Sequence, residues 1–325
     1  MPRTQNFVVG PEHKNLSPYQ FLTRAVRIGQ PGLVRELIRR GHVQVDGSTL
    51  PMLLPLKRGS VVTVGWPLDL EQGQRRFAKK LRVEVLFQNE HVIAVNKPAG
   101  LPVVPERRRE RETVLDVLDP TLAKSKSGQV TRVVHRLDKH TSGVLLLARD
   151  RDAKRMLCAA FNDRTIHKEY LTLVRGTPST ESGEIDLAIG KDRRHALRMV
   201  IAERKGKDAL TRWRIEERFR GYTLLRVFPV TGRTHQIRVH LEHMGFPVLC
   251  DELYGARPEL MLSEIKPGFR SKDAEAEKPL LDRLALHCAA LEFPTGVGSQ
   301  RMRVEAPLPK DLEVVLKQLR KHRTP

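Results

Sequence analysis

The stretch that decides the fold reads VHRLDKHTSGVLLLA over residues 134–148. A polar segment carrying one carboxylate, Asp138, runs directly into an apolar run with the length and branched content of a buried strand. Gly143 allows a sharp backbone turn just before that strand. Asp138 is therefore expected at the mouth of a sheet, where the flanking cations Arg136 and Lys139 would keep it ionised. An average Asp in this setting forms a surface salt bridge, so evidence from the rest of the chain is needed to assign Asp138 a catalytic role.

Charge points to a polyanionic partner. The 325 residues include 58 Lys and Arg against 38 Asp and Glu, a formal net charge of +20, which favours nucleic acid or an anionic surface. No apolar run approaches the ~20 residues of a membrane span, and the N-terminus lacks an apolar signal region. The cysteines, Cys158, Cys250 and Cys288, are far apart and form no Cys-x-x-Cys pair. A soluble, cytoplasmic protein without disulfides or membrane contact is expected.

A small helix-plus-hairpin module is predicted near the N-terminus. Residues 1–16 are polar and are expected to form a mobile arm, followed by a module over 17–66. Ser17 is suited to cap the first helix, with Pro18 as its first residue. Gly41 is suited to end the second helix, before a hairpin that turns at residues 46–47.

This module resembles the RNA-binding module first known from ribosomal protein S four. The residues that carry the resemblance are LIRRGHVQVDG at 37–47 and the Gly59 turn before the last strand. Arg39 and Arg40 are its candidate RNA contacts. The alternative is a basic helix face that is merely solvated.

A linker over 67–81 leads to a large domain over 82–325. Alternating segments predict strands and hairpins with few helices, so the fold class expected is α+β with a mixed, mainly antiparallel sheet. The charged stretches 106–112 and 258–282 are expected to be a solvated segment and an excursion from the core.

Two further segments carry candidate site residues. Residues 166–176 alternate, which places the side chains of Lys168 and Tyr170 on one strand face. Residues 229–241 read PVTGRTHQIRVHL, a Gly turn followed by a helix start. The backbone amides there, with Arg233 and Arg238, form an anion-binding corner that could hold an RNA phosphate or the Asp138 carboxylate.

Cofactor sites are not expected. His235, His240, Glu242 and His243 do not have the His-Glu-x-x-His spacing of a zinc site, and no cysteine pair adds ligands. There is no Walker phosphate loop and no Gly-x-Gly-x-x-Gly fingerprint, so neither a metal nor a nucleotide cofactor is predicted.

With these blocks in place, the chain resembles the RluA-type family of pseudouridine synthases over roughly residues 82–320. Four blocks occur in the family's order: NKPAGL at 96–101, HRLDKHTSG at 135–143, KEY at 168–170 with Gly176, and GRTHQIRVH at 232–240. The chain departs from the family at 103–105, which read VVP where a His is frequent, and in the charged stretch at 258–282.

The resemblance implies a reaction and roles. The family breaks the bond from uracil N1 to ribose C1′ and remakes it from C5, without a cofactor. Asp138 is then the candidate nucleophile and Arg233 its ion-pair partner. Tyr170 is the candidate base that removes the C5 proton, or the ring that stacks on uracil. As a base it would need a nearby cation such as Lys168, because the usual pKa of Tyr is ~10. Attack at C1′, attack at C6 and elimination to a glycal all remain open.

Substrate contacts and target are implied in the same way. The target nucleotide must leave its helix, and Arg136 could fill the gap or contact it. The other candidates for contact with RNA are His135, Lys168 and Arg238, while Leu146 and Ile237 would line the uracil pocket. By analogy, large-subunit ribosomal RNA is favoured over transfer RNA, and a monomer is expected.

Two other classes of function compete with this prediction. A non-catalytic RNA-binding or ribosome-assembly factor would share the charge and the N-terminal module, but not the set of Asp138, Tyr170 and Arg233. A glycosylase usually needs two cooperating carboxylates and a two-metal nuclease needs several, whereas the site blocks offer one convincing Asp.

Overall fold

The structure is a computed structural model. It describes residues 3–26, 34, 37–38, 40–49, 55–66, 83–105, 112–118, 131–195, 197–202, 204–255, 257–269, 277–296 and 300–324. The chain divides into two compact units, Met1–Leu81 and Arg82–Pro325. None of the helices in the described ranges has the length and hydropathy needed to span a bilayer.

The first unit contains a three-stranded antiparallel sheet in the order β1-β3-β2. The strands are β1 (Arg3–Val8), β2 (Val43–Val45) and β3 (Val61–Trp66). The expectation of a mobile arm over 1–16 was wrong, because β1 pairs with β3 along its whole length. Val9, which follows β1, is buried in the core of this unit, and its backbone is also paired: its N donates to Ser60 O and its O accepts from Gly59 N, both at 2.9 Å.

The helical part of the first unit begins at the predicted residue. The elements are η1 (Pro11–His13), α1 (Pro18–Gln20) and η2 (Phe21–Val26). Ser17 Oγ accepts a hydrogen bond from Gln20 N at 3.1 Å, and Gln20 Oε1 accepts one from Ser17 N at 3.0 Å, which is a capping box. Gly41 has a φ of +72° and lets His42 N donate to Leu37 O at 2.8 Å, so it ends the second helical segment as predicted.

The second unit is built on one large sheet in the order β4-β5-β7-β14-β8-β13-β12-β9, with β15 paired to β14 and β6 to β7. All of these pairs are antiparallel except β7 with β14. The α+β class with a mainly antiparallel sheet is confirmed. The strands are β4 (Glu84–Gln88), β5 (Val92–Lys97), β6 (Arg132–Val133), β7 (Ser142–Ala148), β8 (His167–Arg175), β9 (Ser182–Asp186), β12 (Leu210–Phe219), β13 (Tyr222–Pro229), β14 (Leu286–Pro294) and β15 (Arg301–Glu305).

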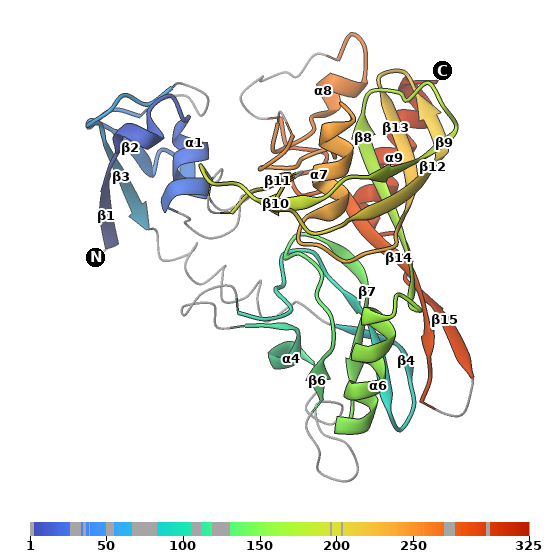
Figure 1. The fold of residues 1–325 in the computed structure, drawn as a ribbon. Helices are drawn as coiled ribbons and strands as arrows, with labels where there is room; N and C mark the ends of the chain where they lie inside the picture. Colours follow the sequence, from blue (N-terminus) through green and yellow to red (C-terminus); the bar gives the residue numbers. More distant parts are fainter. Residues whose placement is uncertain are drawn as a thin grey trace. The chain divides into compact units, whose positions relative to one another are not determined.

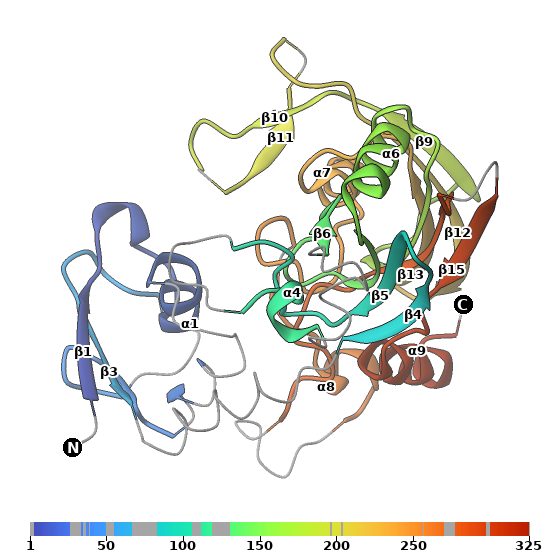
Figure 2. The same cartoon turned by 90° about the horizontal axis from the view of Figure 1, so that it is seen from below.

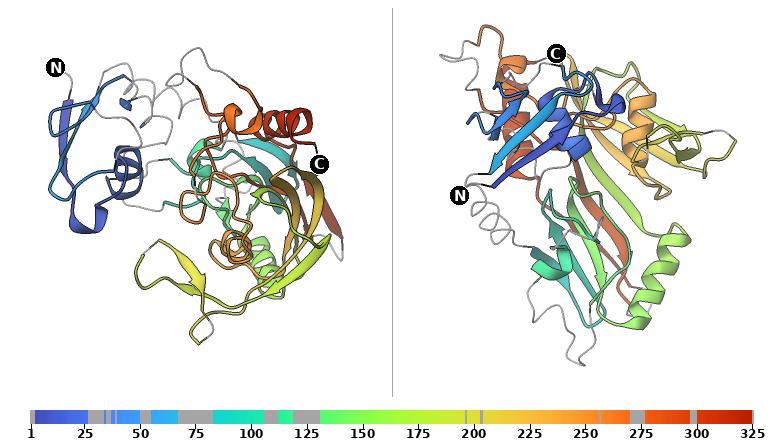
Figure 3. Two further views of the ribbon diagram at one scale, coloured as in Figure 1. Left: turned by 90° about the horizontal axis from the view of Figure 1, so that it is seen from above. Right: turned by 90° about the vertical axis from the view of Figure 1, so that its left-hand side faces the viewer.

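Helices and a separate hairpin complete the unit. They are α4 (Val114–Val117), α6 (Arg151–Asn162), α7 (Gln236–His243), α8 (Leu262–Ile265), α9 (Lys310–His322) and the hairpin of β10 (Ile189–Lys191) with β11 (Met199–Ile201). Figure 1 shows α6 beside β7, and α7 and α9 beside the strands from β8 to β9. Figures 2 and 3 show the hairpin standing away from the large sheet. Of the two charged stretches, residues 106–111 and 270–276 lie outside the described residues.

The predicted strand after the polar stretch is β7, and it is buried along its whole length. Its start depends on Gly143, which has a φ of +111°. A Cβ there would lie 2.1 Å from the carbonyl oxygen of Cys288, because β14 runs directly alongside. Only glycine permits this approach, so it fixes where the chain carrying Asp138 enters the sheet.

Lys97 ties the end of β5 to that same entry point. Its side chain is fully buried, and its ammonium donates to the carbonyl oxygens of Pro98 at 2.9 Å, Leu101 at 2.8 Å and Lys139 at 3.1 Å. The Lys139 carbonyl also accepts from Gly100 N at 2.8 Å. Lys97 is therefore structural, and it anchors the residue that follows Asp138.

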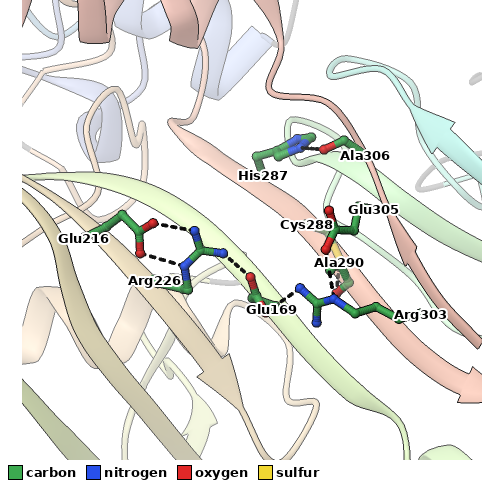
Figure 4. Close-up of polar contacts among 9 residues, drawn as sticks. All are labelled: Glu169, Glu216, Arg226, His287, Cys288, Ala290, Arg303, Glu305 and Ala306. Atoms are coloured by element: carbon green, nitrogen blue, oxygen red, sulfur yellow. Dashed lines mark hydrogen bonds and ion pairs between the residues drawn. The ribbon is translucent and has the colours of Figure 1, made fainter.

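Charged side chains link several strands of the large sheet (Figure 4). Arg226 on β13 contacts Glu216 on β12 and Glu169 on β8. Glu169 also accepts from Arg303 on β15 at 3.0 Å, and Arg303 donates to Glu305 at 2.9 Å. These five residues are called the Glu169 network below.

Candidate active site

A cavity of about 380 Å³ lies where three segments meet. Most of its wall is formed by the loop before β7, the start of β8, and the turn between β13 and α7, and the end of α6 and Leu286 of β14 complete it. It brings together the seven site residues that were predicted for the large domain: His135, Arg136, Asp138, Lys168, Tyr170, Arg233 and Arg238. Ile237 also lines it, as predicted. Leu146 does not fit its predicted place in the wall, because its side chain is fully buried in β7.

Asp138 is held by an arginine that binds two carboxylates. Arg238 Nη1 donates to Asp138 Oδ2 at 3.0 Å. The other edge of the same guanidinium grips Asp251 through two bonds, Nε to Oδ2 at 2.7 Å and Nη2 to Oδ1 at 2.8 Å. Asp251 Oδ1 also accepts from the backbone amides of Leu253 and Tyr254 at 2.9 and 3.1 Å. This fork geometry orients Arg238 firmly while leaving Asp138 held at one oxygen.

The surroundings keep Asp138 ionised. Burial acts to raise its pKa, but His235, Arg238 and Arg136 act in the opposite direction and leave the pKa below its usual value. The Asp138 side chain keeps 20% of its surface exposed, and it faces the cavity. The result is a charged carboxylate with access to a ligand, held by a buried cation whose own pKa is raised.

Arg233 does not take the role expected of it. The prediction that it pairs with Asp138 was wrong, because Arg238 occupies that position. Arg233 lines the cavity, but its Nε donates to the backbone carbonyl of Asp208 at 2.8 Å. The anion-binding corner seen in the sequence does hold the Asp138 carboxylate, through the second of its two arginines.

Tyr170 lies in the cavity wall as an uncharged ring. Its pKa is raised well above the usual value, first by burial and then by the neighbouring Cys288 and Asp138. Burial also raises the pKa of Cys288, to about 12, so the thiol beside Tyr170 is neutral too. The surroundings therefore stabilise the phenol over the phenolate.

Lys168 lies against two backbone carbonyls. Its ammonium donates to the carbonyl oxygens of Thr231 at 2.9 Å and Val230 at 3.4 Å. Its role as the cation that Tyr170 would need as a base stays a prediction. Burial lowers the pKa of Lys168 to about 8. Lys168 thus joins the start of β8 to the turn before α7, at the edge of the cavity.

His135 and Arg136 differ in how they are held. The Nε2 atom of His135 accepts a hydrogen bond from Leu146 N at 2.9 Å, and its ring lies 4.6 Å from that of Phe161. Burial lowers its pKa to about 3, so it is a neutral acceptor that fixes the loop against β7. Arg136 is exposed at the cavity, where a substrate can contact it.

Three site residues were not predicted. His235 lies in the cavity wall with Nε2 at 3.8 Å from Asp138 Oδ2. Its Nδ1 is 3.0 Å from the hydroxyl of Tyr254, and Asp251 holds Arg238. His235 stands inside one of the four recognised blocks, whereas Asp251 and Tyr254 lie outside all of them. The sequence around Asp251 and Tyr254 shows only a carboxylate that follows apolar residues and a tyrosine three positions later. This pattern is too common in proteins to indicate a site.

The N-terminal candidates are placed as follows. Arg39 lies outside the described residues, and Arg40 is exposed just before Gly41 in the first unit. Among the residues that the structure describes, no three His, Cys, Asp or Glu side chains are grouped as metal ligands would be.

Comparison with known proteins gives one consistent result. A family model described as RNA pseudouridylate synthase matches residues 91–243. The chain is 36% identical over 289 residues to the ribosomal large subunit pseudouridine synthase D of Xanthomonas campestris pv. campestris, covering 88% of this chain and 83% of that one. It is 31% identical over 311 residues to the ribosomal large subunit pseudouridine synthase C of Escherichia coli K12, covering 93% and 92%.

A solved structure shows the same likeness. Human RNA pseudouridylate synthase domain containing 4 superposes with a TM-score of 0.59 at 28% identity, covering 77% of this chain and 98% of that one.

Proposed function

The chain belongs to the RNA pseudouridylate synthase family, and from this premise we propose that it isomerises uridines of large-subunit ribosomal RNA, with Asp138 as the nucleophile. The observation that carries the proposal is the ion pair of Asp138 with Arg238, at 3.0 Å in the wall of a cavity. The choice of RNA is supported by the relatives, which are large-subunit ribosomal enzymes.

The reaction needs a carboxylate that is ionised and accessible. The N1–C1′ bond breaks, a C5–C1′ bond forms, and the proton on C5 is replaced by one on N1, so no atom is gained or lost. Whether the carboxylate attacks C1′, attacks C6 or removes a proton to give a glycal, it acts through an electron pair on oxygen. Asp138 has that pair available, because its low pKa leaves it unprotonated near neutral pH.

Arg238 prepares Asp138 without blocking it. A buried cation with one carboxylate partner would be drawn fully onto that partner. Here Asp251, which is completely buried, takes two of the guanidinium bonds and leaves one for Asp138. The nucleophile is therefore oriented before substrate arrives, which lowers the reorganisation needed in the reaction.

The cavity suits a base that has left its helix. Its volume of about 380 Å³ is in the range of small-ligand sites, and its wall mixes apolar and charged side chains. Tyr170 contributes a neutral ring to the lining, which favours a stacking role over that of a phenolate base. The exposed Arg136 is positioned to contact the flipped nucleotide or to fill the space that it leaves.

The first unit is proposed to add affinity for structured RNA. Its support is the resemblance of residues 37–47 to the ribosomal protein S four module and the excess of cations in the chain. We further infer that the protein is a monomer and works in the cytoplasm. We also infer that it needs no cofactor, since the proposed chemistry uses only groups of this chain.

Mapping pseudouridines in total RNA tests the proposal. A strain without this protein should lack pseudouridine at one or a few positions of large-subunit ribosomal RNA, and the wild-type chain should restore them. The Asp138→Asn variant should restore none, whereas Asp152→Asn, at an exposed position on α6, should restore all. Loss of pseudouridines from transfer RNA instead would show that transfer RNA is the substrate. An unchanged map would favour a non-catalytic binding factor.

A further inference from the structure

Tyr254 contacts both of the groups that act on Asp138 from the side of α7. Its hydroxyl lies 3.0 Å from Nδ1 of His235, and its ring centroid lies 5.0 Å from Cζ of Arg238. The side chain is 6% exposed. The chemistry described so far gives no role to Tyr254, and it gives His235 only an effect on the pKa of Asp138.

The hydrogen bonds of the Tyr254 hydroxyl determine where its proton lies. The oxygen accepts from Met199 N at 2.8 Å. Burial raises the pKa of Tyr254 to about 12, so the group keeps its own proton and must donate it. The acceptor within reach is Nδ1 of His235. Donation by His235 instead would leave the buried phenol proton without an acceptor, which is costly.

The remaining ring nitrogen of His235 must then carry hydrogen. If Nδ1 accepts, the neutral imidazole has its proton on Nε2, which is 3.8 Å from Asp138 Oδ2, and the His235 side chain lines the cavity. Burial lowers the pKa of His235 to about 4, so the ring is uncharged near neutral pH. The site thus presents a neutral N–H donor next to the nucleophile.

The backbone of His235 is an independent sign of a constrained position. It has a φ of +56°, in the left-handed region, at the N-cap of α7. Few residues other than glycine adopt this conformation, although His does so more often than most, and the packing around the N-cap holds it here. The conformation directs the imidazole between Tyr254 and Asp138.

We propose that Tyr254 is a positioning residue that holds His235 as its Nε2–H tautomer, so that a neutral donor faces Asp138 and the bound nucleotide. The inference rests on the proposed function. When the N1–C1′ bond breaks, its electron pair moves onto uracil and is shared by the carbonyl oxygens. A neutral donor can bind such an oxygen without weakening the nearby carboxylate.

The proposal also couples the β10–β11 hairpin to the site. Met199 is the first residue of β11. Its neighbour Arg198 also contacts Tyr254, with Cζ of the guanidinium 5.2 Å from the centroid of the Tyr254 ring. The hairpin, seen apart from the large sheet in Figures 2 and 3, thereby supplies the amide that completes the hydrogen bonds of Tyr254.

Two substitutions of His235 separate positioning from stability. In His235→Gln the amide nitrogen can take the place of Nε2, whereas in His235→Asn it takes the place of Nδ1. We expect kcat at saturating RNA to be about tenfold lower for His235→Asn than for His235→Gln, the value of one hydrogen bond. A purely structural role gives the opposite order, because Asn tolerates the left-handed region better. Equal kcat values, or a higher one for His235→Asn, would overturn the proposal.

The tautomer is read directly by ¹⁵N NMR of the imidazole in the full-length protein without RNA. In the wild type the protonated nitrogen of His235 should be Nε2. Tyr254→Phe should give a mixture of tautomers, and kcat should fall about tenfold while KM for RNA changes less than twofold. Tyr222→Phe is the matched control, since Tyr222 is buried beneath Arg175 but does not line the cavity. Tyr222→Phe should change neither the tautomer of His235 nor kcat.

The outcomes are distinguishable. A Tyr254→Phe variant that keeps the Nε2–H tautomer contradicts the proposal, as does one that loses it with unchanged kcat. If that variant does not fold, the order of His235→Gln and His235→Asn decides. A wild-type chain that forms no pseudouridine removes the proposed function, but the tautomer of His235 is still measured.

Discussion

Two arginine–carboxylate networks occur in the same unit, and they are built in opposite ways. In the site, one guanidinium, that of Arg238, lies between the carboxylates of Asp138 and Asp251. In the Glu169 network, one carboxylate lies between the guanidiniums of Arg226 and Arg303 (Figure 4). The network at the site leaves the Asp138 carboxylate in the wall of a cavity, whereas both oxygens of Glu169 are bound by arginine.

The difference shows what separates a reactive charge from a structural one. Asp251 is completely buried and accepts two guanidinium and two backbone bonds, so its charge is fully used. Asp138 accepts one guanidinium bond and keeps 20% of its surface exposed. Glu169 resembles Asp251, since both of its oxygens are bound by arginine. A nucleophile needs a carboxylate oxygen that is not fully hydrogen-bonded, as in Asp138.

Removing the shared guanidinium should have the largest effect. Arg238→Gln leaves the buried Asp251 without its cation, and loss of one partner of a buried pair costs about 3–5 kcal/mol. We expect a lower free energy of unfolding by that amount and loss of pseudouridine formation by at least about a hundredfold. Urea unfolding and a single-turnover assay measure the two. Full activity would show that the ion pair is not required.

Neutralising the structural network should affect stability alone. Glu169→Gln removes a charge that lies between two cations on the large sheet, so we expect the free energy of unfolding to fall by about 1 kcal/mol. The rate of pseudouridine formation should stay within twofold of the wild type. A loss of activity comparable with that of Arg238→Gln would mean that the two networks are coupled.

Arg233 offers a smaller test within the site itself. It lines the cavity without pairing with Asp138, and a guanidinium there can contact RNA phosphate. Arg233→Gln should weaken RNA binding, with a salt dependence reduced by about one phosphate contact, and leave kcat nearly unchanged. If kcat fell as far as in Arg238→Gln, Arg233 would be the true partner of Asp138.

The pH dependence should be the smallest effect near neutrality. The pKa of Asp138 is lower in the folded chain than its usual value. Its contribution to stability is therefore fully present above the unfolded pKa and is lost as pH falls through the folded pKa. Between pH 6 and 8, wild type and Asp138→Asn should show parallel stability curves, diverging only in acid. A difference that changes across pH 6 to 8 would contradict the low pKa.

The sequence predicted the segments of the site better than the contacts within it. Periodicity placed Tyr170 and Lys168 on one face of a strand, and Gly143 marked the entry to β7, because these are local properties. The choice between Arg233 and Arg238 was not local. Six consecutive residues of α7, from Gln236 to Leu241, are buried, so no exposed face indicates which side chain turns toward Asp138.

Two other misses have similar physical causes. Residues 3–8 were assigned to an arm because the strand that they pair with, β3, lies more than fifty positions later in the chain. Asp251 was passed over because a carboxylate in a turn is usually solvated, and only the fold brings Arg238 against it. Both depend on contacts between distant parts of the sequence.

The proposed role of Asp138, a nucleophile held by Arg238, can be tested in one side-by-side measurement. Purified wild type and Asp138→Asn are compared for pseudouridine formation in ribosomal RNA and for affinity for the same RNA. Asp138→Asn should form no product and should bind the RNA with a dissociation constant within about threefold of the wild type, since a neutral isostere keeps the shape of the site. Pseudouridine formed by Asp138→Asn at the wild-type rate would contradict that role.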